Sequence, residues 1–469
     1  MAGLEDVAGV LGVSVPVVRF LLCFLASIPC SWLARFTPAG ALRNLYAAGS
    51  GALLSYYAFG AAANFLFFFP ILVSYGSMLV YRRRCGVITF FIAFAFLIAC
   101  HILMMSGDAW KNGGIDSTGA LMVLTLKVIS AAVCYQDGRP EKQDDLRESQ
   151  KKNQIRDLPS PITFLGYCLN CGTHLAGPVY EIKDYIDWAE NKGLWGPRAD
   201  QPPPLPYKAA GLAMIQALIC MIIYLYLLPR VPLSKFSSPE YQKWGLVDRL
   251  GFMYISGFTA RWKYYFIWSI SQVAMIISGL GFSGWCTTAS SSEPTPDWTR
   301  AKNVDIVKVE LAKSGVELPM YWNISVSTWL RHYVYERLVP KGSKAGFAQL
   351  LSTQVISAVW HGLYFGYFLY FIHSALMIAG SRVLYRWQSA IPPSFVWARR
   401  LGHLINGLFT ALVNNYACIG FLLLSRRDTL DAYSSVYYLG TVVPAAIILF
   451  GSLVKPPRAP SKSKPKKEN

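Results

Sequence analysis

Long apolar blocks alternate with short polar segments along almost the whole chain. Uninterrupted apolar runs of about 18 residues are typical of helices that cross a membrane. Such runs cover Pro16–Ala34, Ala41–Ala62, Phe65–Val80, Gly86–Met105, Ala120–Cys134, Ala209–Leu228, Phe252–Phe282, Phe347–Ala379, Leu401–Leu424 and Val436–Val454, and Val316–Val339 is a further candidate. The pattern predicts an all-α polytopic membrane protein with about eleven transmembrane helices, some of them re-entrant or interfacial.

The composition agrees with this pattern, since 54% of the residues are hydrophobic and only 15% are charged. A soluble chain of 469 residues would usually divide into domains with charged surfaces. We therefore expect one integral membrane domain over residues 1–454 and a disordered, basic cytosolic tail over residues 455–469. The sequence shows no internal repeat, which argues against a transporter built from repeated halves.

The formal net charge of +18 does not indicate a nucleic-acid partner. In polytopic proteins Lys and Arg gather in cytosolic loops, as in the cluster Arg82–Arg84 at one span end. The segment Gln136–Asp157 mixes both signs and is predicted to be the longest solvated loop. The basic tail lacks the aromatic residues that a single-stranded nucleic-acid platform uses.

The two ends of the chain predict its orientation and address. Glu5 and Asp6 precede the first basic residue, Arg19, which already lies in the first span, so we expect an uncleaved anchor. The final residues "KKEN" match the dilysine pattern that cytosolic coat proteins read. This pattern predicts a multi-pass protein of the endoplasmic reticulum membrane with a cytosolic C-terminus.

The segment "CLNCGTH" places Cys168, Cys171 and His174 together. A zinc site normally needs four such ligands, and no second Cys/His pair lies nearby in the sequence. Packing or turn geometry is the favoured interpretation, and we expect no bound metal.

A histidine stands inside the apolar stretch "SAVWHGLYFGY". Gly362 and Gly366 would share one helical face, so His361 could be a polar contact within a helix-packing interface. Alternatively, His361 is a catalytic base in a protein cavity, because a neutral imidazole is cheaper to bury than a charged group and can accept a proton. These two readings stay open on this stretch alone.

The segment "YWNISVSTWLRHYVYERLV" has apolar residues at three-to-four spacing and reads as an amphipathic helix. Such a helix could lie at the membrane interface, anchored by its aromatic residues and arginines. Asn323 could cap its N-terminus or serve as a hydrogen-bonding group in a reaction. Arg331 could hold a phosphate.

Two cations, Arg261 and Lys263, interrupt another apolar run in "ARWKYYFIWSI". The usual explanation for such residues is that they lie at the end of a span and extend their charged groups to the membrane–water interface. The alternative is that they contact a phosphate. The following "SGLGFSG" fits a break or re-entrant turn. "ASSSEPTPDW" (Ala289–Trp298) is predicted to be a polar loop.

With these motifs together, the sequence resembles the membrane-bound O-acyltransferase family. The family's histidine signature is matched by Trp360, His361, Gly362, Gly366 and Tyr367, and its asparagine signature by Trp322, Asn323, Trp329 and Leu330. "GGIDSTGALMVLTLKVIS", "STWLRHYVYERLV" and "SAVWHGLY" are closest to the plant-type lysophospholipid acyltransferases. One departure is Phe365, where many relatives have a proline.

The resemblance implies transfer of a fatty acyl group from acyl-CoA to the free hydroxyl of a lysophospholipid, lysophosphatidylcholine and lysophosphatidylethanolamine among others. It implies a central reaction tunnel with His361 as general base and Asn323 assisting. Acyl-CoA is then a substrate, and no cofactor is expected. The residues implied for substrate contact are Trp360, Trp322, Arg331, Lys263, Arg261, Tyr264 and Tyr367. A family member with a neutral-lipid or protein acceptor, or a transporter, remains an alternative.

Overall fold

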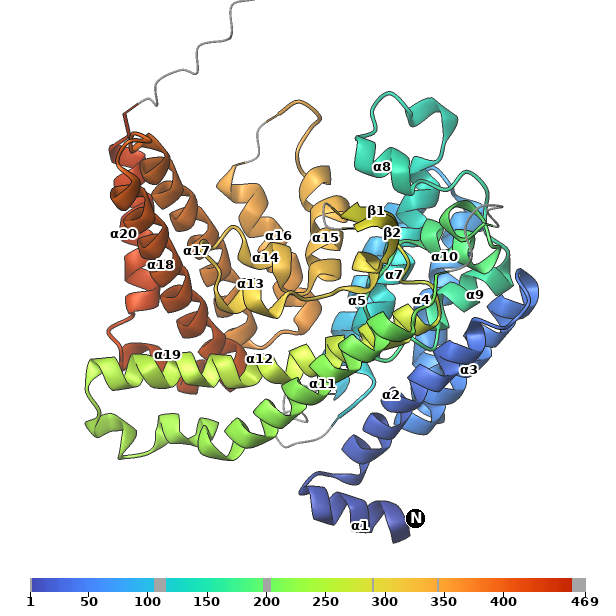
Figure 1. Ribbon diagram of the computed structural model, residues 1–469, viewed down its shortest axis with the longest axis horizontal. Helices are drawn as coiled ribbons and strands as arrows, with labels where there is room; N and C mark the ends of the chain where they lie inside the picture. The colour runs from blue at the N-terminus through green and yellow to red at the C-terminus, as the bar shows by residue number, and fades with distance from the viewer. Residues whose placement is uncertain (1, 105–114, 197–203, 289–290, 344–345, 458–469) are drawn as a thin grey trace, which may run out of the picture.

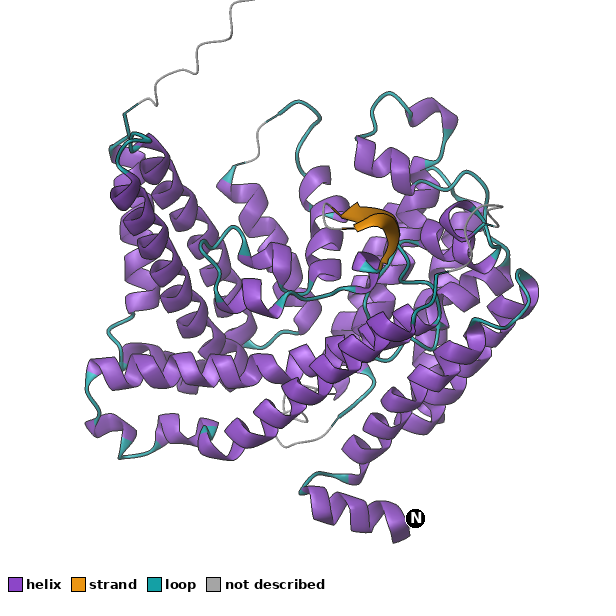
Figure 2. Cartoon of the chain, in the orientation of Figure 1, coloured by secondary structure: helices purple, strands orange, loops and turns teal. Residues whose placement is uncertain are grey.

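The computed structural model of the protein describes residues 2–104, 115–196, 204–288, 291–343 and 346–457. Within these residues the chain is mostly helical, and its strands form one two-stranded antiparallel hairpin (Figures 1 and 2). The described α-helices and β-strands are α1 (Ala2–Leu11), α2 (Val15–Ala34), α3 (Ala41–Phe59), α4 (Ala61–Val80), α5 (Cys85–Met104), α7 (Thr118–Asp137), α8 (Glu148–Asn153), α9 (Pro161–Leu169), α10 (Ile182–Ala189), α11 (Tyr207–Leu227), α12 (Leu246–Ile277), β1 (Gly284–Thr288), β2 (Ser291–Asp297), α13 (Ile306–Glu310), α14 (Leu318–Tyr321), α15 (Ile324–Tyr333), α16 (Phe347–His361), α17 (Phe365–Ala390), α18 (Val396–Leu423), α19 (Arg426–Ser434) and α20 (Leu439–Leu453).

Seven helices of the described chain are long and apolar enough to cross a membrane: α2, α4, α5, α7, α11, α17 and α18. The pair α19 and α20, bent by 71°, would make an eighth if it forms one broken span. The predicted all-α, multi-pass architecture is confirmed. The number of eleven spans is not confirmed.

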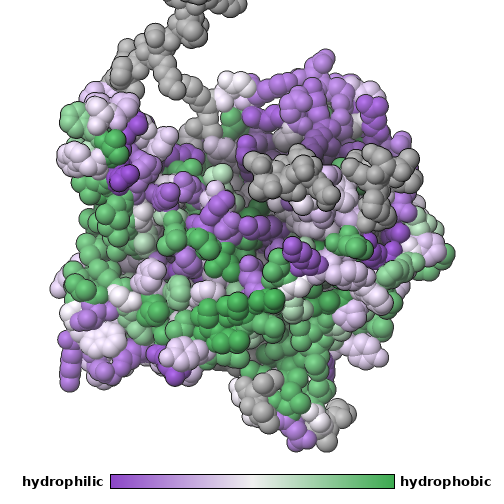
Figure 3. All heavy atoms as spheres, in the orientation of Figure 1, coloured by the Kyte–Doolittle hydropathy of each residue, from purple (hydrophilic) through white to green (hydrophobic). Residues whose placement is uncertain are grey.

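The spanning helices differ in how much of their surface other helices cover. In α7, 83% of the apolar window is buried, whereas in α11 only 17% is buried. A helix that is apolar all round and buried all round belongs at the centre, and one that stays exposed faces lipid. α11 packs along α12, and the apolar band of Figure 3 lies over these two helices. We infer that α7 lies at the centre of the molecule and that α11 lies at its edge, facing lipid.

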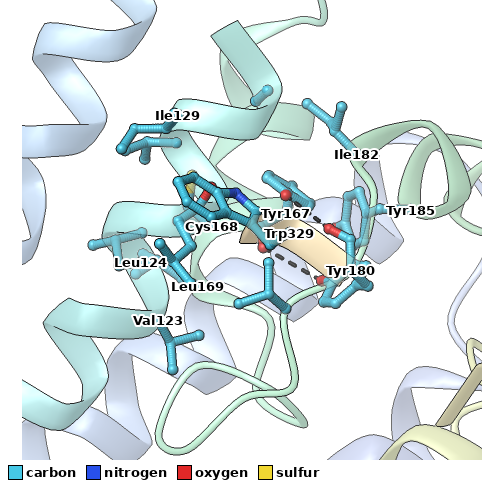
Figure 4. Packing of buried hydrophobic residues seen from close by; sticks show 14 of the residues in the cluster. Val123, Leu124, Ile129, Tyr167, Cys168, Leu169, Tyr180, Ile182, Tyr185 and Trp329 are labelled. Atoms are coloured by element: carbon cyan, nitrogen blue, oxygen red, sulfur yellow. Dashed lines mark hydrogen bonds between the residues drawn. The ribbon is translucent and has the colours of Figure 1, made fainter. Parts of the chain in front are cut away.

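Lys127 lies in the middle of α7 and is fully buried. Its ammonium nitrogen donates hydrogen bonds to the backbone oxygen of Cys168 at 3.1 Å and to Thr173 Oγ1 at 3.3 Å. The rings of Tyr167 and Tyr180 lie 5.0 and 4.9 Å from the same nitrogen. These two tyrosines are hydrogen-bonded to each other in the core that Figure 4 shows. Lys127 therefore joins α7 to the C-terminal end of α9 and to the loop that follows it.

The apolar run Phe347–Ala379 is not one helix. It divides into α16 and α17 at Gly362, whose φ of 133° and ψ of 175° no helix contains. The prediction that Gly362 and Gly366 share one helical face is therefore wrong. Gly366 does allow close helix approach, because a Cβ atom there would lie 2.0 Å from the backbone oxygen of Gly420 in α18.

Three other predicted segments fold differently. Val316–Val339 contains two short helices, α14 and α15, and a 10-residue helix at 1.5 Å per residue is too short to span a membrane. Gln136–Asp157 is not a loop throughout, since it begins in the last turn of α7 and carries α8. No residue of α8 is buried, whereas Asp137 and Leu146 are buried. Ala289–Trp298 supplies strand β2. These segments were predicted from hydropathy and turn residues, which indicate burial or exposure but do not fix where a helix or strand begins and ends.

Candidate active site

His361 is the last residue of α16. The helix ends there because Gly362 adopts a positive φ, and its N–H still donates to the backbone oxygens of Ala358 and Val359. A side chain at position 362 would also meet Tyr367 at 3.4 Å. Residues other than glycine rarely adopt this conformation. The glycine that follows the histidine therefore places the imidazole at a helix end, and not in the middle of a helix.

Aromatic rings surround the imidazole of His361. The ring centroid of Trp360 lies 4.7 Å away, that of Phe371 lies 5.2 Å away in a stacked arrangement, and that of Phe421 lies 5.1 Å away edge-on. Within the described residues, neither ring nitrogen has a hydrogen-bond partner. The imidazole is thus held by packing, and its nitrogens stay available to a ligand in the cavity.

Trp360, the residue before this histidine, is held by two hydrogen bonds to distant helices, one through its backbone oxygen and one through its indole N–H. Nε2 of His101 in α5 lies 3.0 Å from the backbone oxygen of Trp360, although 259 positions separate the two residues. Since a carbonyl oxygen only accepts, Nε2 carries the proton. The indole N–H of Trp360 donates to the backbone oxygen of Met122 in α7 at 2.9 Å. α5 and α7 therefore position the end of α16.

Asn323 directly precedes α15 and has a left-handed backbone, with φ 45° and ψ 55°. Asparagine tolerates this region better than most residues. Its side chain makes no capping bond to the helix. Instead, its Oδ1 accepts a hydrogen bond from Asn303 Nδ2 at 3.1 Å.

Two cavities meet at His361 and Asn323. Both are lined by these two residues together with Tyr264, Trp268, Val326 and Phe421. The first cavity, about 340 Å³, continues past Trp322 to Arg331 and Arg382. The second, about 200 Å³, continues to His101, Asp116 and Asn303. A group in either cavity can reach the histidine and the asparagine.

The structure gathers most of the predicted site residues around these cavities. The Trp322 ring packs edge-on against Trp268 at 4.8 Å and lines the first cavity. Trp360 and Tyr367 line the second cavity, and Tyr264 lines both. His361, at the end of α16, and Asn323, just before α15, thus both line the same two cavities, together with several aromatic side chains.

The three predicted phosphate contacts have different surroundings. Arg261 lines the first cavity, but its guanidinium forms a bidentate ion pair with Glu310, with N···O distances of 2.8 and 2.7 Å. Lys263 lines neither cavity, and its ammonium lies 5.2 Å from the ring centre of Tyr264. Arg331 is exposed at the far end of the first cavity and pairs with Glu336 at 3.0 Å.

Sequence reasoning missed three residues of the second cavity: His101, Asp116 and Asn303. His101 carried a signal, because it is an ionisable residue at the end of an apolar run. Asn303 carried none, since it lies in a polar connection between short elements. Its contact with Asn323 depends only on the tertiary fold.

The segment with Cys168, Cys171 and His174 is buried in the core. The His174 ring packs edge-on against Phe67, with 4.7 Å between ring centres. In the part of the chain that the structure describes, no three His, Cys, Asp or Glu side chains converge as metal ligands.

Comparison with known proteins matches residues 102–425 to the membrane-bound O-acyltransferase family, MBOAT. The chain is 58% identical over 465 residues to lysophospholipid acyltransferase 1 of Arabidopsis thaliana and 56% identical to lysophospholipid acyltransferase 2 of the same plant, with 99% of each chain covered. It is 28% identical to a lysophospholipid acyltransferase of Schizosaccharomyces pombe, over 96% of this chain and 89% of that protein. The resemblance found in the sequence motifs is thereby confirmed.

Proposed function

The chain belongs to the membrane-bound O-acyltransferase family and is a membrane-embedded O-acyltransferase, and we propose that it acylates the free hydroxyl of lysophospholipids with acyl-CoA as the donor. The observation that carries this proposal is the shared wall of two cavities at His361 and Asn323. A two-substrate transfer needs a place where both substrates reach the same catalytic groups. The names of the relatives supply the acceptor class.

His361 would act as the general base. It takes the proton of the acceptor hydroxyl while that oxygen attacks the thioester carbonyl carbon. The carbon–sulfur bond then breaks, and the imidazolium returns the proton to the departing CoA thiolate. A thioester is already activated, so the step needs neither a covalent enzyme intermediate nor a cofactor. General-base catalysis of this type typically contributes about 10²–10⁴-fold.

The two cavities suit two substrates of different character. We assign the thioester to the first cavity, because Arg331 and Arg382 at its far end can contact phosphates. The lysophospholipid hydroxyl would enter from the second cavity. Arg261 would not contact phosphate in this scheme, because Glu310 already neutralises it.

The cellular setting belongs to the same proposal. The multi-pass protein would lie in the endoplasmic reticulum membrane with its C-terminus in the cytosol, where coat proteins read the dilysine pattern. That pattern lies outside the described residues.

The test is an assay of membranes from a host with low endogenous activity, supplied with oleoyl-CoA and a panel of lysophospholipids that differ in headgroup. Diacylglycerol, a sterol and a peptide serve as competing acceptors. We expect His361→Ala to lose nearly all activity at normal expression. The matched control is His403→Ala, because this histidine lies exposed on α18 and away from both cavities.

Two results would overturn the proposal separately. Retention of more than a few per cent of activity by His361→Ala would remove the base assignment. Transfer to diacylglycerol, sterol or peptide, with none to lysophospholipids, would remove the acceptor assignment.

A further inference from the structure

Asn303, between β2 and α13, is bonded to three consecutive residues at the start of α15. It is 2% exposed. Its backbone oxygen accepts from the N–H of Ile324 at 2.9 Å, and its Oδ1 accepts from the N–H of Ser325 at 2.9 Å. Its Nδ2 donates to Oδ1 of Asn323 at 3.1 Å. The side chain and the carbonyl of Asn303 therefore hold the residue before the helix and the first two N–H groups of the helix.

These contacts cap α15 from outside the helix. The first N–H groups of a helix have no partner within it, and a side chain just before the helix usually accepts from them. Here Asn303 accepts from two of them, Ile324 and Ser325. The side chain of Asn323, which stands at the capping position, is thereby released from that role.

The chemistry of the donors also fixes the direction of each amide. A backbone N–H can only donate, so the Asn303 atom that faces Ser325 is its oxygen. The other end of the same amide is then NH₂, which also only donates, so the Asn323 atom that faces it is an oxygen. The NH₂ group of Asn323 consequently points away from Asn303, at a residue that lines both cavities.

We propose that Asn303 is a positioning residue that holds Asn323 as a hydrogen-bond donor to the thioester oxygen. The inference deepens the proposed acyl transfer and rests on it. As the acceptor oxygen attacks, negative charge develops on that thioester oxygen, and a preorganised donor stabilises it. Loss of one such donor typically lowers kcat about 10²–10³-fold. Asn323 would then not act as an acceptor that orients the imidazole or the hydroxyl.

The decisive variant is Asn303→Asp, because it preserves the shape and the acceptor for Ser325. A carboxylate cannot donate to Asn323, so the Asn323 amide rotates and presents its oxygen to the cavity. We expect kcat for oleoyl transfer to fall about 10²-fold or more, with the KM for oleoyl-CoA changed less than about threefold. Asn323→Asp, which also removes the donor, should show the same pattern.

A pH profile separates this role from a merely structural one. A protonated aspartic acid can donate, so the activity of Asn303→Asp relative to the native enzyme should rise as the pH is lowered from about 8 to about 6. Asn303→Ala loses the cap and the donor together, and it should be both inactive and less thermostable in detergent. Its relative activity should not recover at low pH.

The inference is overturned if Asn303→Asp keeps more than a third of the native kcat, or if its relative activity does not change with pH. Failure of the acceptor assignment would be visible independently, in the native enzyme. In that case the kcat of Asn303→Asp is compared with the native kcat by using whichever acceptor of the panel the native enzyme accepts.

Discussion

The ion pair between Arg261 and Glu310 is predicted to stabilise the fold, not to bind substrate phosphate. Both side chains are largely buried, with 7% and 14% of their surfaces exposed. Arg261 also donates to Asn415 Oδ1 at 2.7 Å, and Tyr265 donates its hydroxyl to Glu310 at 2.6 Å. This network joins α12, α13 and α18.

The loss of stability when one partner of this ion pair is replaced depends on which charged group remains buried without its partner. Glu310→Leu leaves a buried guanidinium and the Tyr265 hydroxyl without their acceptor, and breaking a buried pair in this way costs about 3–5 kcal/mol. Arg261→Met leaves a buried carboxylate and should cost a similar amount. The double variant Arg261→Met/Glu310→Leu removes both charges, so it should be more stable than either single variant.

The assay is the apparent melting temperature of detergent-solubilised protein, followed by size-exclusion chromatography at one heating time. Asp431→Asn is the matched control. The side chains of Asp431 and its partner Arg427 are 70% and 91% exposed, and such exposed ion pairs contribute little to stability. We expect Glu310→Leu to lower the melting temperature at least about three times more than Asp431→Asn does. The reasoning is refuted if Arg261→Met raises the KM for acyl-CoA while its melting temperature stays at the native value.

Three further outcomes follow from the site and its scaffold. Gly366→Ala should destabilise the protein by more than about 2 kcal/mol because α17 and α18 must separate. Gly76→Ala is the control, since Gly76 has open space around it, and it should be neutral or slightly stabilising. Thermal melting of both variants checks this. His101→Leu should lower kcat about tenfold, because it removes the hydrogen bond to the Trp360 backbone. His101→Gln should keep most of the activity, because its amide nitrogen can replace Nε2. An equal loss of kcat in both variants would contradict the hydrogen-bond argument. Cys168→Ser should keep most of the activity in the same transfer assay, and complete loss at normal expression would point to a role for the thiol.

Several features of the site were visible in the sequence because they are local. The apolar runs predicted the membrane helices, and the motifs around His361 and Asn323 marked both residues before any contact was known. The basis is that hydropathy and short motifs depend on neighbours a few positions apart. The break after α16 was missed because the run stays apolar through Gly362, and only the backbone conformation of that glycine ends the helix.

The sequence by itself therefore determined the class of protein, the family resemblance and the two residues of the proposed chemistry. The tertiary structure decided which groups these residues meet. It brought His101 to the backbone of Trp360, paired Arg261 with Glu310, and set Asn303 against Asn323. The physical reason is that burial and hydrogen bonding in a membrane protein are satisfied between helices, and a linear pattern carries no information on which helices become neighbours.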